Sequence, residues 1–209
     1  MSPRIAVVDY GIGNLRSAEK ALQHLDADAS LTSDARAIER ADAVVLPGVG
    51  AFGACMKALR AAGLEDVTRT AATDGRPFLG ICIGMQMLFD GSDETPDVAG
   101  LGVVAGRVTL LPKTVRLPQM GWNTLDVVDG ARLAVDLPDP AWLYFVHSYA
   151  PEPDDEGVVS AWCEYGRRFA AMIESGPVWA TQFHPEKSGA VGMHLLQNFV
   201  DTVASVERA

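Results

Sequence analysis

A cysteine between two glycines, in Gly80-Ile81-Cys82-Ile83-Gly84, is the feature of this sequence that best suits covalent chemistry. The apolar run 77–81 predicts a short buried strand, and residues 83–89 predict the start of a helix. A side chain at such a strand-to-helix corner projects from the backbone, and the glycines leave room for a sharp turn. The helix N-terminus favours a thiolate and offers N–H groups to an oxyanion. The pattern therefore predicts a nucleophilic Cys82.

Cys82 could also be an ordinary core residue, because cysteine is among the most buried residue types. A second segment, Gln182-Phe183-His184-Pro185-Glu186, favours the chemical interpretation. It follows a strand-like stretch, so we expect His184 and Glu186 to point the same way. Glu186 could then hold the imidazole in one tautomer while its other nitrogen faces a thiol. A histidine at a strand end can also be a capping or surface residue, but the two segments together predict a catalytic triad.

A glycine-rich segment, Gly48-Val49-Gly50-Ala51-Phe52-Gly53, matches the dinucleotide-binding pattern G-x-G-x-x-G. Two features weaken that interpretation. The segment follows the third predicted strand rather than the first, and the next strand ends at Cys82 instead of at an acidic residue. Its backbone N–H groups would serve equally well as donors to a reacting carbonyl oxygen.

Composition excludes several classes of protein. The chain has 209 residues, is 48% hydrophobic and carries a net charge of -10, which predicts one soluble domain and argues against nucleic-acid binding. It shows no signal peptide and no membrane span, and three scattered cysteines suit a reducing compartment, so we expect a cytoplasmic protein. Cys55 is predicted to be a core residue, and Cys163 shows no catalytic context. The sequence predicts no metal and no cofactor.

The order of predicted elements indicates an α/β fold. Over the first ninety residues, strands alternate with helices, which predicts a mostly parallel sheet covered on both faces. Strands are expected at 5–10, 28–32, 43–46 and 77–81, and helices at 14–25, 34–40 and 51–62. Shorter strand-like runs at 103–110, 116–123, 142–149, 158–165, 169–174 and 178–183 predict antiparallel hairpins that extend this sheet, before a closing helix at 188–206. Sites in such folds lie at the carboxyl ends of the parallel strands, where Cys82 is placed.

With these motifs, the chain resembles the class I glutamine amidotransferases and, within them, the glutaminase subunits of imidazole glycerol phosphate synthase. The matching segments run almost from end to end. They are Asp9 to Leu15, Pro47 to Phe52, Gly80 to Gln86, Met120 to Asn123, Phe145 to Tyr149 and Gln182 to Ser188. One departure is Gln119, where that family usually has histidine. This departure could alter the expected interface, and it leaves the triad untouched.

The resemblance implies a role for each matching residue. Cys82 would attack the side-chain carboxamide of glutamine, and His184, oriented by Glu186, would pass a proton to the departing ammonia. A glutamyl thioester would form and then be hydrolysed to glutamate. The oxyanion donors would be backbone N–H groups of Ile83 and of Val49 or Gly50. The glutamine pocket would consist of Gln86, Glu94, Ser148 and Tyr149, with Glu94 facing the α-ammonium group. Gln86 could instead be a helix-surface amide, and Ser148 and Tyr149 ordinary strand residues.

The same resemblance implies a partner, a (β/α)₈ cyclase that forms a heterodimer with this chain and receives its ammonia. The products would be imidazole glycerol phosphate and an aminoimidazole carboxamide ribotide, in histidine biosynthesis. The interface residues would be Trp122, Asn123, Tyr144 and Lys187, although Trp122 could equally belong to the core. Two alternatives remain open: a glutaminase subunit of another amidotransferase, such as pyridoxal phosphate synthase, and a non-catalytic binding protein on the same fold.

Overall fold

The central feature of the computed structural model, which describes residues 2–12 and 15–206, is an eight-stranded sheet. Its strand order is β2-β1-β3-β4-β13-β12-β11-β8. The first five of these strands are parallel, and the last three continue the sheet in antiparallel fashion. Their bounds are β1 (Arg4–Val8), β2 (Asp28–Thr32), β3 (Ala43–Gly48), β4 (Phe78–Cys82), β8 (Asp126–Val127), β11 (Val159–Glu164), β12 (Arg168–Ser175) and β13 (Val178–Thr181).

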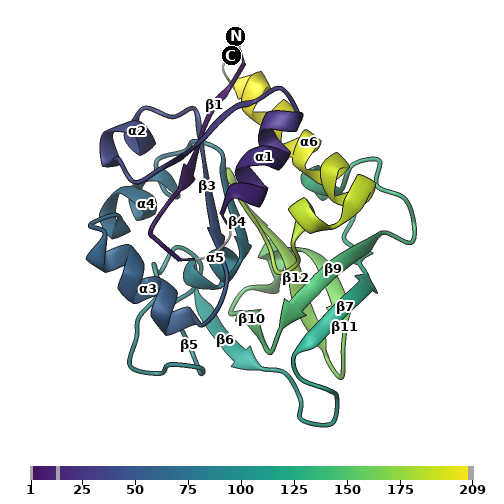
Figure 1. Ribbon diagram of the computed structural model, residues 1–209. Coiled ribbons are helices and arrows are strands. Elements are labelled where there is room, and N and C mark those ends of the chain that lie inside the picture. The colour runs from purple at the N-terminus through teal and green to yellow at the C-terminus, as the bar shows by residue number, and fades with distance from the viewer. Residues whose placement is uncertain (1, 13–14, 207–209) are drawn as a thin grey trace.

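Helices cover both faces of the parallel part of the sheet (Figure 1). On one face lie α1 (Arg16–His24) and α6 (Gly189–Val206), and on the other lie α2 (Ala35–Glu39), α3 (Phe52–Ala61) and α4 (Glu65–Ala71). A further short helix, α5 (Ile83–Met87), begins directly after β4. The predicted α/β class with a mostly parallel sheet is therefore confirmed. The predicted helix start at Asn14 lies outside the described residues.

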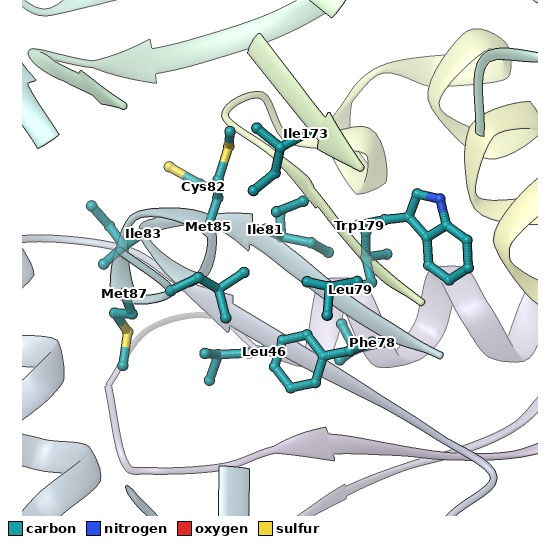
Figure 2. Packing of buried hydrophobic residues seen from close by; sticks show 14 of the residues in the cluster. Leu46, Phe78, Leu79, Ile81, Cys82, Ile83, Met85, Met87, Ile173 and Trp179 are labelled. Carbon is teal, nitrogen blue, oxygen red and sulfur yellow. The ribbon is translucent and has the colours of Figure 1, made fainter. Parts of the chain in front are cut away.

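The central strands are buried on both faces, which explains why they read as continuous apolar runs. Every residue of β3 and β4 is buried, and Leu46, Phe78 and Leu79 are fully inaccessible to solvent. Figure 2 shows Leu46 beside Phe78, while Leu79 lies nearer to Trp179 of β13, which is its register partner in the sheet. The site residue therefore follows one of the most rigidly packed parts of the molecule.

The second half of the chain differs from the predicted single extended sheet. Four strands from this half join the main sheet: β13 in its parallel part, and β12, β11 and β8 as an antiparallel extension. The other strands form two small sheets of their own. One has the order β10-β6-β5 and the other pairs β7 with β9. Their bounds are β5 (Gly91–Ser92), β6 (Gly106–Leu110), β7 (Gln119–Thr124), β9 (Trp142–His147) and β10 (Tyr149–Pro153). The predicted run 142–149 is thus two strands, divided at Ser148, which belong to different sheets.

Two helices differ from the sequence-based expectation. The helix α4 was not predicted, because its sequence EDVTRTA is mostly polar and only two of its residues are buried. Residues 83–89 were expected to begin a longer helix, but the helix α5 ends at Met87. It stops there because the carbonyls of Met87 and Leu88 accept hydrogen bonds from the N–H groups of Leu101 and Val103, at 2.8 Å each. A neighbouring loop thus replaces the next helical turn.

Three 3₁₀ turns complete the secondary structure of the described residues: η1 (Arg132–Ala134), η2 (Glu156–Val158) and η3 (Pro185–Lys187). Within the described part of the chain, no helix combines the length and the apolar character that crossing a bilayer would require.

Candidate active site

Cys82 occupies a strained corner between β4 and α5. Its backbone has φ +54° and ψ −109°, a left-handed φ that non-glycine residues rarely adopt. Both flanking glycines are required by packing. A Cβ at Gly84 would lie 1.7 Å from the carbonyl oxygen of Leu46, and one at Gly80 would lie 3.0 Å from the carbonyl oxygen of Gly84. The glycines therefore permit a turn that the cysteine itself makes at an energetic cost.

The helix that follows Cys82 supplies less electrostatic help than the sequence suggested. It has five residues, so few peptide dipoles are aligned behind its N-terminus. Electrostatic stabilisation of negative charge on the Cys82 sulfur must therefore come chiefly from neighbouring side chains.

His184 and Glu186 contact each other directly. Nδ1 of His184 lies 2.8 Å from Oε1 of Glu186, and both side chains are almost completely buried. We expected this contact to arise from an extended strand in which residues two apart point the same way, and that explanation was wrong. The strand β13 ends at Thr181, and His184 caps the 3₁₀ turn η3. Two backbone contacts hold that turn: His184 N–H donates to the carbonyl of Tyr144 at 3.0 Å, and its carbonyl accepts from the Ser188 hydroxyl at 2.6 Å.

The other nitrogen of His184, Nε2, is buried and makes no hydrogen bond to a nitrogen or oxygen atom. It belongs to the same cavity wall as Cys82. Burial disfavours the charged imidazole, but hydrogen bonding and charge interactions with Cys82 and Glu186 outweigh it and raise the pKa of His184 to about 9. At neutral pH the imidazole is therefore protonated on both nitrogens, with Nδ1 facing the Glu186 carboxylate and Nε2 on the side of the Cys82 cavity.

The raised pKa of His184 predicts a pH-dependent stability. Relative to an unfolded value of about 6.5, the protonated form stabilises the fold fully below pH 6.5, and this contribution is lost as pH rises through about 9. Glu186→Gln removes one cause of the shift. Its deficit in free energy of unfolding should be largest below pH 6.5 and shrink towards pH 9, as measured by urea unfolding. The exposed Glu39→Gln is the control, and a deficit for Glu186→Gln that does not vary with pH would contradict the assignment.

The cavity beside Cys82 has a volume of about 460 Å³, within the range of small-molecule sites. It brings together ten of the fourteen predicted site residues from five separate segments, and the four outside its lining are Glu186, Trp122, Asn123 and Tyr144. Its lining consists of Val49, Gly50, Cys82, Ile83, Gln86, Glu94, Pro118, Val146, His147, Ser148, Tyr149, His184 and Lys187. A second cavity of about 440 Å³, formed by the 125–141 segment, contains no cysteine or histidine and so offers no nucleophile or proton-transfer group.

The predicted glutamine-binding residues all lie on this cavity wall, but two of them have further contacts. Oε2 of Glu94 accepts a hydrogen bond from the N–H of Phe52 at 2.7 Å, which ties the carboxylate to the start of α3. Nε2 of Gln86 donates to the carbonyl of Tyr149 at 2.9 Å, while its Oε1 is buried without a partner. Gln86 is therefore buried rather than a helix-surface amide, and it has one free acceptor beside the cavity.

The predicted oxyanion segment is tied to the core through its carbonyl groups. The hydroxyl of Tyr10 donates to the carbonyl of Pro47 at 2.8 Å, and Sγ of Cys55 donates to that of Val49 at 3.3 Å. Cys55 is buried, as expected, but it also orients the Val49–Gly50 peptide. The sequence offered no sign of this contact, because it depends on how α3 folds back over the loop.

Three of the predicted interface residues lie on the β7–β9 ribbon, and the fourth, Lys187, belongs to η3. Trp122 pairs with Tyr144, their rings lie 6.1 Å apart, and Trp122 is 54% exposed, which excludes the core interpretation. Asn123 lies on the other face, where its amide donates to the carbonyl of Glu164 at 3.0 Å. Lys187 is exposed at the cavity wall. Lys187 therefore lines the cavity, whereas Trp122 and Tyr144 lie on the ribbon outside its lining, and Asn123 ties β7 to β11.

Two residues beside the cavity were missed by the sequence-based prediction. His147 is buried, and burial lowers its pKa to about 4, so it is neutral at physiological pH. Gln182 is completely buried and donates to Sγ of Cys82 at 3.7 Å. Because Gln182 lies two residues before His184, the sequence could have indicated that it lies near the site. Among the described residues, no group of three or more metal-ligating side chains is present.

The chain is similar in sequence to one family of known proteins over almost its whole length. The family model for class-I glutamine amidotransferases matches residues 6–203. The imidazole glycerol phosphate synthase subunit HisH of Methanothermobacter thermautotrophicus is 48% identical over 199 residues, with 95% of this chain and 98% of the relative covered. The HisH subunit of Halobacterium salinarum is 47% identical over 207 residues, with 96% and 94% covered.

Solved structures show the same fold at lower sequence identity. A crystal structure of a glutamine amidotransferase superimposes with a TM-score of 0.75 at 24% identity, covering 95% of this chain and 98% of that one. The PurLQS structure from Thermotoga maritima also gives 0.75, at 21% identity, with 97% and 99% covered. At these identities the structures support the architecture alone.

Proposed function

Because this chain belongs to the class-I glutamine amidotransferase family and, within it, to the HisH glutaminase subunits of imidazole glycerol phosphate synthase, we propose that Cys82, His184 and Glu186 carry out its glutamine hydrolysis. The single observation that supports this assignment best is the position of His184. Its Nδ1 is held by Glu186 at 2.8 Å, and its Nε2 and the Cys82 sulfur share one cavity. Relatives named as HisH subunits of imidazole glycerol phosphate synthase, at 43–48% identity, favour that synthase over pyridoxal phosphate synthase as the enzyme that uses the ammonia.

In the first half of the proposed reaction, the sulfur of Cys82 attacks the carboxamide carbon of glutamine. The C–S bond forms while the C=O electron pair moves onto oxygen, which N–H groups of Ile83 and of Val49 or Gly50 would stabilise. The proton already on Nε2 of His184 is then transferred to the amide nitrogen. The C–N bond breaks, ammonia leaves, and a glutamyl thioester remains on Cys82.

In the second half, the neutral His184 accepts a proton from water, and the resulting hydroxide attacks the thioester carbon. Collapse of this second tetrahedral intermediate breaks the C–S bond and releases glutamate. The sulfur leaves as a thiolate beside the re-protonated imidazole, which restores the starting charges. Glu186 keeps Nδ1 protonated throughout, so that only Nε2 exchanges a proton with the substrate.

The chain acts together with a cyclase, and we propose that the exposed face of the β7–β9 ribbon contributes to that contact. This face carries Met120, Trp122 and Trp142, which are 66%, 54% and 50% exposed. Large apolar side chains at this exposure are typical of protein interfaces. The ribbon adjoins the catalytic turn, because the backbone of Tyr144 bonds to both His184 and Ser188. A (β/α)₈ barrel seated here would receive ammonia directly from the cavity.

Trp122→Ala tests this surface. A central aromatic residue of an interface typically contributes about 2 kcal/mol or more, so we expect binding of the cyclase to weaken about 30-fold. The affinity is measured by titration calorimetry, and glutamine hydrolysis by the isolated chain should not change. Val135→Ala, another exposed apolar residue away from the ribbon, is the control and should bind normally. Equal affinity for the Trp122 variant and wild type would place the cyclase elsewhere.

A further inference from the structure

Two buried glutamine side chains form a chain of hydrogen bonds that ends on the reactive sulfur. Nε2 of Gln182 donates to Sγ of Cys82 at 3.7 Å, within the range for a sulfur acceptor. Oε1 of Gln182 accepts from Nε2 of Gln86 at 3.0 Å. Gln86 and Gln182 are 1% and 0% exposed, so water does not compete for these contacts.

The contacts of Gln86 fix which way both amides point. Its Nε2 carries two N–H groups, and these go to Oε1 of Gln182 and to the carbonyl of Tyr149, at 3.0 and 2.9 Å. A reversed Gln86 amide would place an oxygen against those two oxygens, which is unfavourable. Gln182 must therefore turn its oxygen to Gln86 and its N–H groups to Cys82.

The Tyr149 carbonyl is itself held in place from a second direction. Nδ1 of His147 lies 2.9 Å from it, and because the buried His147 is neutral, its single N–H must sit on Nδ1 to make this bond. The backbone of Gln182 is equally fixed, since its N–H donates to the carbonyl of Ala171 in β12 at 2.8 Å. Both ends of the hydrogen-bond chain are thus anchored in rigid strands.

We propose that Gln182 is a fourth catalytic residue, which donates an N–H to the Cys82 sulfur, and that Gln86 is a positioning residue that keeps the donor aimed at it. This inference rests on the proposed function, in which that sulfur is the nucleophile. A hydrogen bond to a charged acceptor is about twice as strong as one between neutral groups, so the donor favours the thiolate over the thiol. It acts at two points, on the attacking thiolate and on the thiolate that leaves when the thioester is hydrolysed.

The test is the pH dependence of Cys82 alkylation by iodoacetamide in the full chain, quantified by mass spectrometry of the peptide containing Cys82. Gln182→Met keeps the size and apolar stem but removes the donor. We expect its alkylation midpoint to lie about one pH unit above that of wild type, which is a tenfold lower rate below the midpoint. Gln119→Met is the matched control, since Gln119 is also a buried glutamine, and its midpoint should equal that of wild type.

The role of Gln86 is tested by combining variants. Gln86→Met should raise the midpoint less than Gln182→Met, and the double variant should show no more than the shift of Gln182→Met alone, because Gln86 acts through Gln182. Gln86→Met also serves as the test if Gln182→Met does not fold. Shifts that add, or midpoints equal to wild type, overturn the inference. If either result is found while Cys82→Ala abolishes glutaminase activity, only the role of Gln182 is overturned. If Cys82→Ala leaves glutaminase activity unchanged, the proposed function itself is overturned.

Discussion

Cys82→Ala is expected to abolish glutamine-dependent synthesis by the complex with the cyclase while leaving ammonia-dependent synthesis intact. Removal of a nucleophile that forms a covalent intermediate typically lowers kcat by a factor on the order of 10⁴ to 10⁶. Added ammonia bypasses that step because it enters after the thioester chemistry. The two rates are measured on the same purified complex, with glutamine or an ammonium salt as the nitrogen source.

The substitution should be structurally mild, because alanine removes only a sulfur that lines a cavity. Cys163→Ala is the matched control, since Cys163 is an equally buried free thiol in β11, and it should retain both activities. Survival of glutamine-dependent synthesis in the Cys82 variant would contradict the assignment of the nucleophile. Loss of both activities would mean that the change disturbs the cyclase as well.

His184→Gln is expected to produce the second large loss, on the order of 10⁴-fold in glutamine hydrolysis. Glutamine can still hydrogen-bond, but it can neither carry the proton to departing ammonia nor take one from water. Steady-state glutaminase assays on the complex measure this effect. The combined Cys82→Ala and His184→Gln variant should be no slower than the worse single variant, because residues that act as one unit are not additive.

His194→Gln controls for loss of a histidine as such, because His194 is exposed on α6, away from the cavity. Its glutaminase activity should match wild type. An activity of His184→Gln within a few-fold of wild type would mean that another group transfers the proton. The neutral His147, which also lines the cavity, would then be the next residue to replace.

Much of this architecture could be predicted from the sequence because the signals are local. The buried strands β1, β3 and β4 are continuous apolar runs, and the elbow at Cys82 is marked by glycines whose packing leaves no room for a Cβ at position 84. The proposed triad could also be predicted from the sequence, since Cys82, His184 and Glu186 occur in two short motifs. A nucleophilic cysteine needs a nearby base and an orienting acid, so the residue types alone indicate that these three side chains act together.

What the sequence could not provide depends on contacts between distant segments. The pairing of β7 with β9, apart from the main sheet, joins positions 18 (Thr124 with Trp142) to 28 (Gln119 with His147) residues apart, so no single run of side chains encodes it. The pairing of His184 with Glu186 through a 3₁₀ turn rests on anchors from Tyr144 and Ser188. The contact of Gln182 with Cys82 spans 100 positions and joins an amide to a thiol, and no local pattern marks the two side chains as partners.

The most direct test of the central claim is to trap the covalent intermediate. The complex with the cyclase is mixed with glutamine, quenched in acid within the first turnovers, digested and examined by mass spectrometry. The mechanism predicts a glutamyl group attached through a thioester to the peptide containing Cys82, at higher occupancy in Glu186→Gln if hydrolysis of the thioester is slowed more than its formation. Active turnover with a glutamyl adduct on a different residue would contradict it.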